Sequence, residues 1–139
     1  MDQWSGYDAE RTRLLEFLAA RRPANPVVLT GDIHSNWVND LLVNFDDAQG
    51  QVVATEFVVT SISSGGNGVD LSAQAAAMLA ENPFVRFHNG QRGYVSCALT
   101  PQTLEARYQV VGSVTEPGAP IQTRAAFHVE DGRPGAVPA

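Results

Sequence analysis

The chain has 139 residues and a formal net charge of −6, and 44% of its residues are hydrophobic. This length and apolar content suit one domain, or part of a larger one, and exclude wholesale disorder. The nine Lys and Arg residues are scattered, which excludes a nucleic-acid-binding surface. No run of about 18 apolar residues is present, so no segment is predicted to span a membrane.

The N-terminal quarter predicts a helix followed by a strand. Apolar residues at helical spacing favour a helix over residues 7–22, ended by Pro23. Residues 27–30 form a short continuous apolar run, which is typical of a central strand covered on both faces. Residues 32–37 are then expected to form the loop at the carboxyl end of that strand, where open α/β sheets place their ligands.

The middle of the chain predicts a hairpin and a second helix. Residues 41–60 read as two apolar arms around turn residues 46–50. A small-residue loop follows, and an alanine-rich helix is expected over residues 71–81, with Asp70 as its cap.

The C-terminal half predicts β-structure. Alternating residues indicate two strands joined by a turn at 100–102, and Leu104, Ala106, Tyr108 and Val110 are expected to face one way. Residues 124–130 are expected to form the last strand, and the tail from about residue 132 is expected to be frayed. The fold class is therefore mixed α/β with a β-rich C-terminal half, and residues 1–139 are treated as one structural unit.

The strongest chemical signal is the segment Gly31-Asp32-Ile33-His34. In an extended segment, residues two apart point to the same side, so Asp32 and His34 could present a carboxylate and an imidazole to one metal ion or to two neighbouring ions. Mixed oxygen and nitrogen ligands suit Fe, Mn or Zn, and the carboxylate also suits Ca²⁺. The alternative is that Asp32 caps a turn and His34 is an ordinary polar residue.

Several segments, taken in order, resemble the C-terminal part of the alkaline phosphatase D (PhoD-like) metallophosphoesterase family. The resemblance extends from Asp2 to about Gly135. It is carried by residues 2–7, 25–37, 55–57, 60–66 and 92–95.

The resemblance implies a metallophosphoesterase-like sandwich of mixed sheets flanked by helices. It implies hydrolysis of phosphomonoesters and phosphodiesters at a centre of Fe³⁺ and Ca²⁺, in a secreted or periplasmic protein. Asp32 and His34 match the late G-D-x-H motif of the family, whose acidic and imidazole groups are metal ligands and can serve separate ions. Catalytic and substrate-binding residues are not assigned by this resemblance.

The chain also departs from the family, because the motifs that carry the other metal ligands are absent. Two ligands are too few to close a di-metal site, so we expect the chain to be an incomplete, C-terminal portion that is inactive alone. Met1 falls just before a segment that family members place inside the domain, which indicates a truncated or split gene product. The missing half would come from a partner chain, and uncovered apolar faces predict self-association. The alternatives are a non-catalytic β-rich binding module on the same scaffold and a product without function.

Five other features have weaker signals. Residues 63–68 form a small-residue loop that is either flexible or a contact for phosphate. Arg92 could reach a phosphate, but a structural hydrogen bond to a turn is the expected role. Trp37 is expected to pack as a core aromatic rather than gate a pocket, and His88 is expected to be partly buried. Cys97 is expected to be a small core residue rather than a nucleophile.

Overall fold

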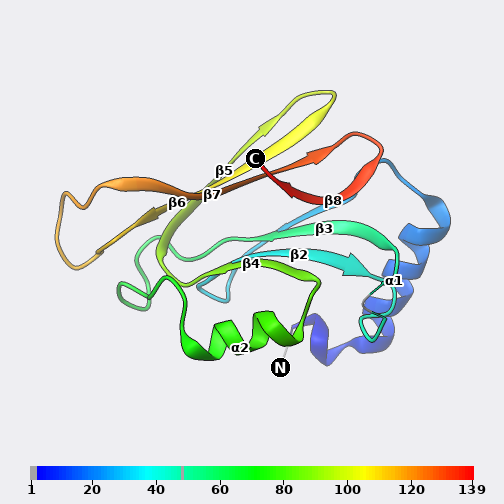
Figure 1. Ribbon diagram of the computed structural model, residues 1–139, viewed down its shortest axis with the longest axis horizontal. Coiled ribbons are helices and arrows are strands. Elements are labelled where there is room, and N and C mark those ends of the chain that lie inside the picture. Colours follow the sequence, from blue (N-terminus) through cyan, green and yellow to red (C-terminus); the bar gives the residue numbers. More distant parts are fainter. Residues whose placement is uncertain (1–2, 48) are drawn as a thin grey trace.

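The computed structural model describes residues 3–47 and 49–139. Its fold is strand-rich, with two four-stranded sheets that pack against each other (Figure 1). The first sheet has the order β1 (Val27–Thr30), β3 (Val52–Val58), β2 (Asn36–Leu42) and β4 (Val85–Asn89). The second sheet has the order β5 (Arg92–Leu99), β6 (Thr103–Val111), β7 (Ile121–Glu130) and β8 (Arg133–Pro138).

The two sheets differ in how their strands pair. In the first sheet β1 runs parallel to β3, whereas β2 pairs antiparallel with both β3 and β4. The second sheet is antiparallel throughout, with each strand beside its neighbour in sequence. The predicted hairpin is confirmed, although its first arm begins at Asn36, and Ala48 of its turn lies outside the described residues, as do Met1 and Asp2.

The core lies between the two sheets. Tyr108 is completely buried, and its hydroxyl donates a 2.6 Å hydrogen bond to the Trp37 carbonyl across the interface. Burial raises the pKa of Tyr108, so the phenol stays neutral. The predicted inward face of β6 is confirmed, because period-two alternation needs only local sequence. The buried cluster consists of Val38, Phe57, Ala106, Tyr108, Phe127, Val129 and Ala136.

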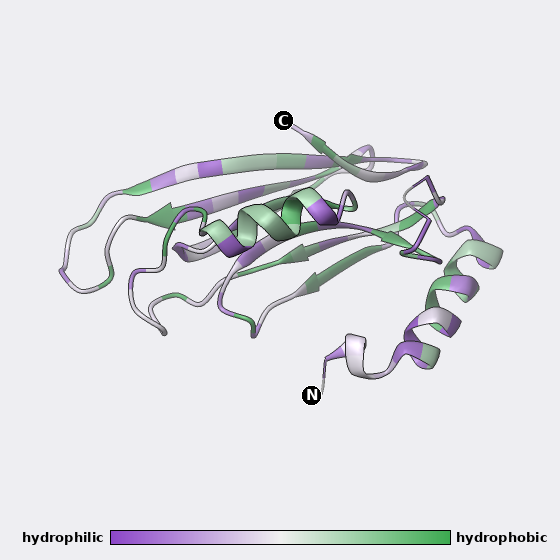
Figure 2. Cartoon of the chain, turned by 60° about the horizontal axis from the view of Figure 1, so that its bottom comes forward, coloured by the Kyte–Doolittle hydropathy of each residue, from purple (hydrophilic) through white to green (hydrophobic). Residues whose placement is uncertain are grey.

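Two α-helices and one 3₁₀ turn complete the fold. The turn η1 (Trp4–Gly6) leads into α1 (Asp8–Arg21), and α2 (Ala73–Glu81) lies on the side of the first sheet away from the second sheet (Figure 1). In Figure 2, α2 is mostly apolar, whereas polar residues recur along α1, which buries only Leu15. No helix in the described part of the chain is long and apolar enough to cross a membrane.

Helix α2 confirms the predicted helix but corrects its cap. The Ser72 hydroxyl accepts a 3.1 Å hydrogen bond from the Ala75 amide, so Ser72 is the N-cap. The prediction that Asp70 caps this helix is wrong. Asp70 instead accepts hydrogen bonds from Asn89 and Arg124, and the hydrogen bond from Arg124 is the main cause that lowers the Asp70 pKa.

Three burial predictions are wrong. Strand β1 is at the edge of its sheet rather than at its centre, and Leu29 is 61% exposed. The tail is not frayed: residues 133–138 form β8, which pairs with β7 and buries Ala136 in the core. Cys97 is exposed on β5, an edge strand of the second sheet that pairs with β6. In each case the outcome depends on pairing or coverage by other segments, which the local pattern does not contain.

Candidate metal-ligand loop

The predicted ligand residues lie in a five-residue connection between β1 and β2, residues 31–35, which we call the ligand loop. Because β3 lies between β1 and β2, this loop passes the carboxyl end of β3 and reverses the chain direction. The Ile33 amide donates a 2.9 Å hydrogen bond to the Gly31 carbonyl, which tightens the turn. The prediction that the loop follows the carboxyl end of a strand is therefore confirmed, but its predicted end at residue 37 is wrong, because Asn36 and Trp37 belong to β2.

The ligand loop is not extended. Asp32 has a φ of 71° and His34 a φ of 59°, so both residues are left-handed. This region is uncommon for residues other than glycine, although Asp and His tolerate it better than most. The assumption of an extended segment was wrong because the chain must turn back within a few residues. Strained backbone of this kind concentrates at functional sites.

Asp32 and His34 have different surroundings. Asp32 is exposed and lines an open hollow of about 460 Å³ together with Trp4, Trp37 and Glu56. His34 is also exposed, and its Nδ1 lies 3.6 Å from the position that a Cβ on Gly65 would occupy. Within residues 3–47 and 49–139, no group of three or more His, Cys, Asp or Glu side chains is placed to hold a metal ion.

A buried arginine lies directly under the ligand loop. Arg92, the first residue of β5, donates from Nη1 to the His34 carbonyl and to the Thr60 hydroxyl, the latter at 2.9 Å. Its Nε donates a 2.8 Å hydrogen bond to the Gly66 carbonyl. The expectation that Arg92 makes structural hydrogen bonds to a turn is thus confirmed.

A network of buried amides supports the same end of the first sheet. Asn36 Oδ1 accepts a 3.0 Å hydrogen bond from the Thr60 amide, and Asn36 Nδ2 donates to Asn89 Oδ1 at 3.1 Å. Asn89 in turn donates to Asp70 at 2.7 Å. Satisfied buried networks of this kind fix a single arrangement of the backbone. Sequence reasoning missed Asn36 and Asn89, because Asn36 fell within the predicted loop of residues 32–37 and neither amide belongs to a recognisable motif.

The small-residue loop, residues 63–68, lies against the ligand loop and is called the glycine loop. Gly65, Gly66 and Gly68 all have positive φ. A Cβ on Gly68 would lie 1.8 Å from the Gly90 carbonyl oxygen, so only glycine fits there. The predicted contact with phosphate stays a prediction.

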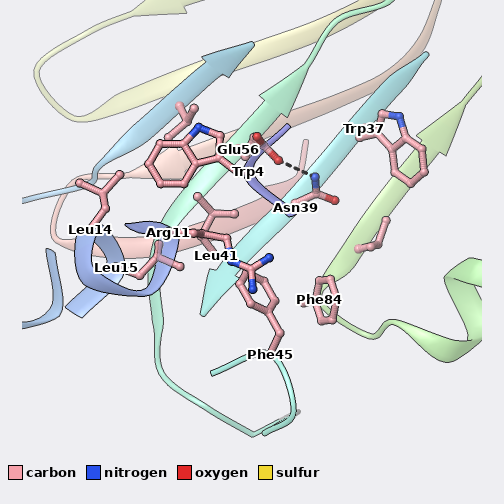
Figure 3. A pocket seen from close by; sticks show the side chains of 12 residues that line it. Trp4, Arg11, Leu14, Leu15, Trp37, Asn39, Leu41, Phe45, Glu56 and Phe84 are labelled. Atoms are coloured by element: carbon pink, nitrogen blue, oxygen red, sulfur yellow. Dashed lines mark hydrogen bonds between the residues drawn. The ribbon is translucent and has the colours of Figure 1, made fainter. Parts of the chain in front are cut away.

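An apolar pocket of about 350 Å³ lies beside the ligand loop, between α1 and the outer face of the first sheet (Figure 3). Asn39 donates a 2.7 Å hydrogen bond to Glu56 at its wall, and both residues also line the hollow at Asp32. Trp37 is half-buried here rather than in the core, with its ring edge against His88 at a centroid distance of 4.4 Å. His88 is partly buried, as predicted.

Comparison with known proteins assigns the chain to a protein family. A solved structure described as "Structure of PhoD" matches 99% of this chain with a TM-score of 0.93 and 44% identity, which confirms the mixed, strand-rich fold. Alkaline phosphatase D of Bacillus subtilis (strain 168) is 48% identical over 127 residues, or 91% of this chain. The PhoD-like phosphatase family matches residues 1–108. The chain belongs to the PhoD-like phosphatase family.

The matches also define how much of each relative is represented. The chain spans 22% of the length of the Bacillus alkaline phosphatase D and 26% of the solved PhoD chain. The family assignment and the fold therefore apply to this chain, whereas the relatives contain a large additional part.

Proposed function

We propose that the chain forms part of a metal-dependent phosphoric ester hydrolase of the alkaline phosphatase or phosphodiesterase type, in which Asp32 and His34 are metal ligands. The proposal rests chiefly on membership of the PhoD-like phosphatase family together with an intact G-D-x-H segment. Both ligand candidates have left-handed backbone at the end of the first sheet. This conformation costs free energy in residues other than glycine, and it persists where the surrounding structure enforces it, often at functional sites. Family membership favours this role over a non-catalytic binding module.

The donor atoms fit the metals that the family resemblance implies. A carboxylate oxygen suits both Fe³⁺ and Ca²⁺, and an imidazole nitrogen suits iron. Both side chains are exposed, and in the described ranges neither makes a hydrogen bond or an ion pair, so both are available as ligands. When bound, such ions polarise the phosphoryl group and neutralise the charge that develops on it.

Two ligands do not complete a metal centre, so we propose that the remaining ligands come from outside this chain. The relatives are about four times longer than the region that this chain matches. The missing groups would then be supplied by a segment or a partner chain equivalent to the rest of the relatives. We propose that the chain is inactive alone and acts on a phosphate ester only when completed.

A chimera tests this proposal. Residues of this chain would replace the matching 127 residues of the Bacillus alkaline phosphatase D. Hydrolysis of p-nitrophenyl phosphate and bis-p-nitrophenyl phosphate would then be measured with Fe³⁺ and Ca²⁺ present. We expect Asp32→Ala and His34→Ala to lower kcat/KM by about 100-fold or more, because loss of a metal ligand removes positioning and charge stabilisation.

Asp46→Ala is the matched control, since Asp46 is an exposed acid in the β2–β3 turn and is remote from the ligand loop. It should retain the activity of the unaltered chimera. An active chimera that tolerates both Asp32→Ala and His34→Ala would overturn the ligand assignment.

A further inference from the structure

Arg92 stands out because it is a buried cation for which the described residues provide no acidic partner. Its exposed fraction is 7%, and it is the one charged residue in the described part of the chain that is classed as buried. The ion pairs among the described residues involve other arginines. Burying a charge is costly unless it is paired or well hydrogen-bonded. Hydrogen bonds from neutral groups must therefore offset the cost of burying this guanidinium.

Neutral oxygens from two connections, β1–β2 and β3–α2, take the place of a carboxylate. Nη1 donates to the His34 carbonyl in the ligand loop and to the Thr60 and Ser61 hydroxyls, and Nε donates to the Gly66 carbonyl in the glycine loop. A planar guanidinium fixes the directions of these hydrogen bonds. The arginine thereby sets where the carbonyls of His34 and Gly66 lie relative to each other.

The backbone of Arg92 is held in place by the second sheet. Arg92 opens β5 and pairs with Val111 of β6. A Cβ on the next residue, Gly93, would lie 1.9 Å from the Gln109 carbonyl oxygen, so β5 and β6 approach closely there. The Gly93 amide also donates a 3.2 Å hydrogen bond to the Ser61 carbonyl. The side chain thus extends from a rigid strand of one sheet to two loops at the end of the other.

We propose that Arg92 is the positioning residue of the ligand loop. By holding the His34 carbonyl, it maintains the left-handed backbone of His34 and so sets the direction of the imidazole beside the glycine loop. Gly65 and Gly68 leave room for this arrangement, because a Cβ on Gly68 would lie 3.0 Å from Arg92 Nη2. The inference deepens the proposed function and rests on His34 being a metal ligand. Arg92 itself contacts neither metal nor substrate in this role.

The test uses the full chain, labelled with ¹⁵N, and two measurements. Amide hydrogen exchange of residues 31–35 and 65–68 reports how firmly the loops are held, without any metal. Paramagnetic broadening of the same amide signals during a Mn²⁺ titration reports occupancy of the loop, even when binding is weak. Mn²⁺ is a suitable probe because it accepts mixed oxygen and nitrogen ligands.

Arg92→Gln should accelerate exchange in both loops by about 10-fold or more, as expected on losing charge-assisted hydrogen bonds. It should also raise the Mn²⁺ concentration for half-maximal broadening by about 10-fold, since groups that orient a ligand typically change metal affinity by that factor. Arg107→Gln is the matched control on the exposed side of β6, and it should change neither quantity. Thr60→Val should also leave the loop in place, because the contact between Arg92 and His34 remains.

Arg92→Lys separates positioning from general structural support. The lysine ammonium keeps the positive charge, but it cannot donate to the His34 and Gly66 carbonyls with the fixed geometry of a guanidinium. Compared with Arg92→Gln, Arg92→Lys should therefore restore part of the exchange protection and part of the Mn²⁺ affinity. If Arg92→Gln does not fold, Arg92→Lys carries the test, with faster exchange expected in residues 31–35 and 65–68 and not in β6.

Unchanged exchange and Mn²⁺ broadening in Arg92→Gln, relative to Arg107→Gln, would overturn the inference. Absence of loop broadening in the unaltered chain would be a different result. It would show that Asp32 and His34 do not hold Mn²⁺ without the missing ligands, and the exchange rates of residues 31–35 and 65–68 would then decide by themselves whether Arg92 holds the loop.

Discussion

The space between the two sheets and the margin of the first sheet around β1 differ in how completely the chain fills them. Between the sheets, side chains from both layers are buried together, and Tyr108 bridges them through its hydroxyl. At the margin, Val28 and Leu29 of β1 are 37% and 61% exposed, and α1 leaves an open apolar pocket against the sheet. The chain therefore completes one core by itself and leaves a second apolar region open beside the ligand loop.

The contrast between the filled core and the open margin indicates which parts of the fold this chain forms without another segment. The second sheet pairs strands that are neighbours in sequence, so its register needs no other segment. Strand β1 pairs with β3, and its other edge has no paired strand among the described residues. An edge with unpaired backbone groups and exposed apolar side chains favours association. This agrees with the proposal that a further segment or chain completes the site.

The largest effect on the free energy of unfolding is expected from substitutions in the core between the two sheets. Tyr108→Ala should lower the free energy of unfolding by about 3–5 kcal/mol, because it leaves a large cavity between the sheets. Tyr108→Phe should cost only about 0.5–1.5 kcal/mol, the value of the lost hydrogen bond to Trp37. Urea unfolding measures both. Equal losses for the two variants would show that the hydroxyl, not the packed ring, holds the sheets together.

A smaller, pH-dependent effect is expected at the outer face of the first sheet, where His88 packs against Trp37. Burial lowers the pKa of His88, and the charge of Asp70 opposes this shift by less. The unfolded chain then binds more protons below about pH 6.5, so the stability from neutral His88 should be lost as the pH falls through this range.

The measurement is the free energy of unfolding at pH 7 and pH 5. His88→Gln, which does not titrate, should show a smaller fall than the unaltered chain. An undiminished fall in His88→Gln would assign the pH dependence to other groups.

The smallest effect on stability is expected at the exposed edge. Leu29→Lys should change the free energy of unfolding by less than about 0.5 kcal/mol, because the side chain is mostly in solvent. It should nevertheless reduce self-association in sedimentation velocity, because a lysine on an edge strand opposes strand pairing. A monodisperse monomer before the substitution would show that the open margin does not drive association.

Most of the elements could be predicted from the sequence because their signals are local. The helix over residues 7–22 was correct to within one residue at each end, and the alternation on β6 correctly identified its inward side chains. The resemblance carried by ordered segments was sufficient to identify the family, which the comparisons confirm. The identity of Asp32 and His34 as ligand candidates also came from the sequence, although their coordination of metal stays a prediction.

The tertiary structure decided which elements are covered and how the ligand loop is shaped. The sequence of β1 is apolar, yet its position at a sheet edge depends on which strands pair with it. Residues 133–138 look like a tail until β7 provides a neighbour. The connection from β1 to β2 must pass β3, and in this turn Asp32 and His34 adopt left-handed backbone. The hydrogen bond that the His34 carbonyl accepts comes from Arg92, more than fifty residues away in sequence. Burial and long-range hydrogen bonds are properties of pairs of segments, so no single segment of sequence contains them.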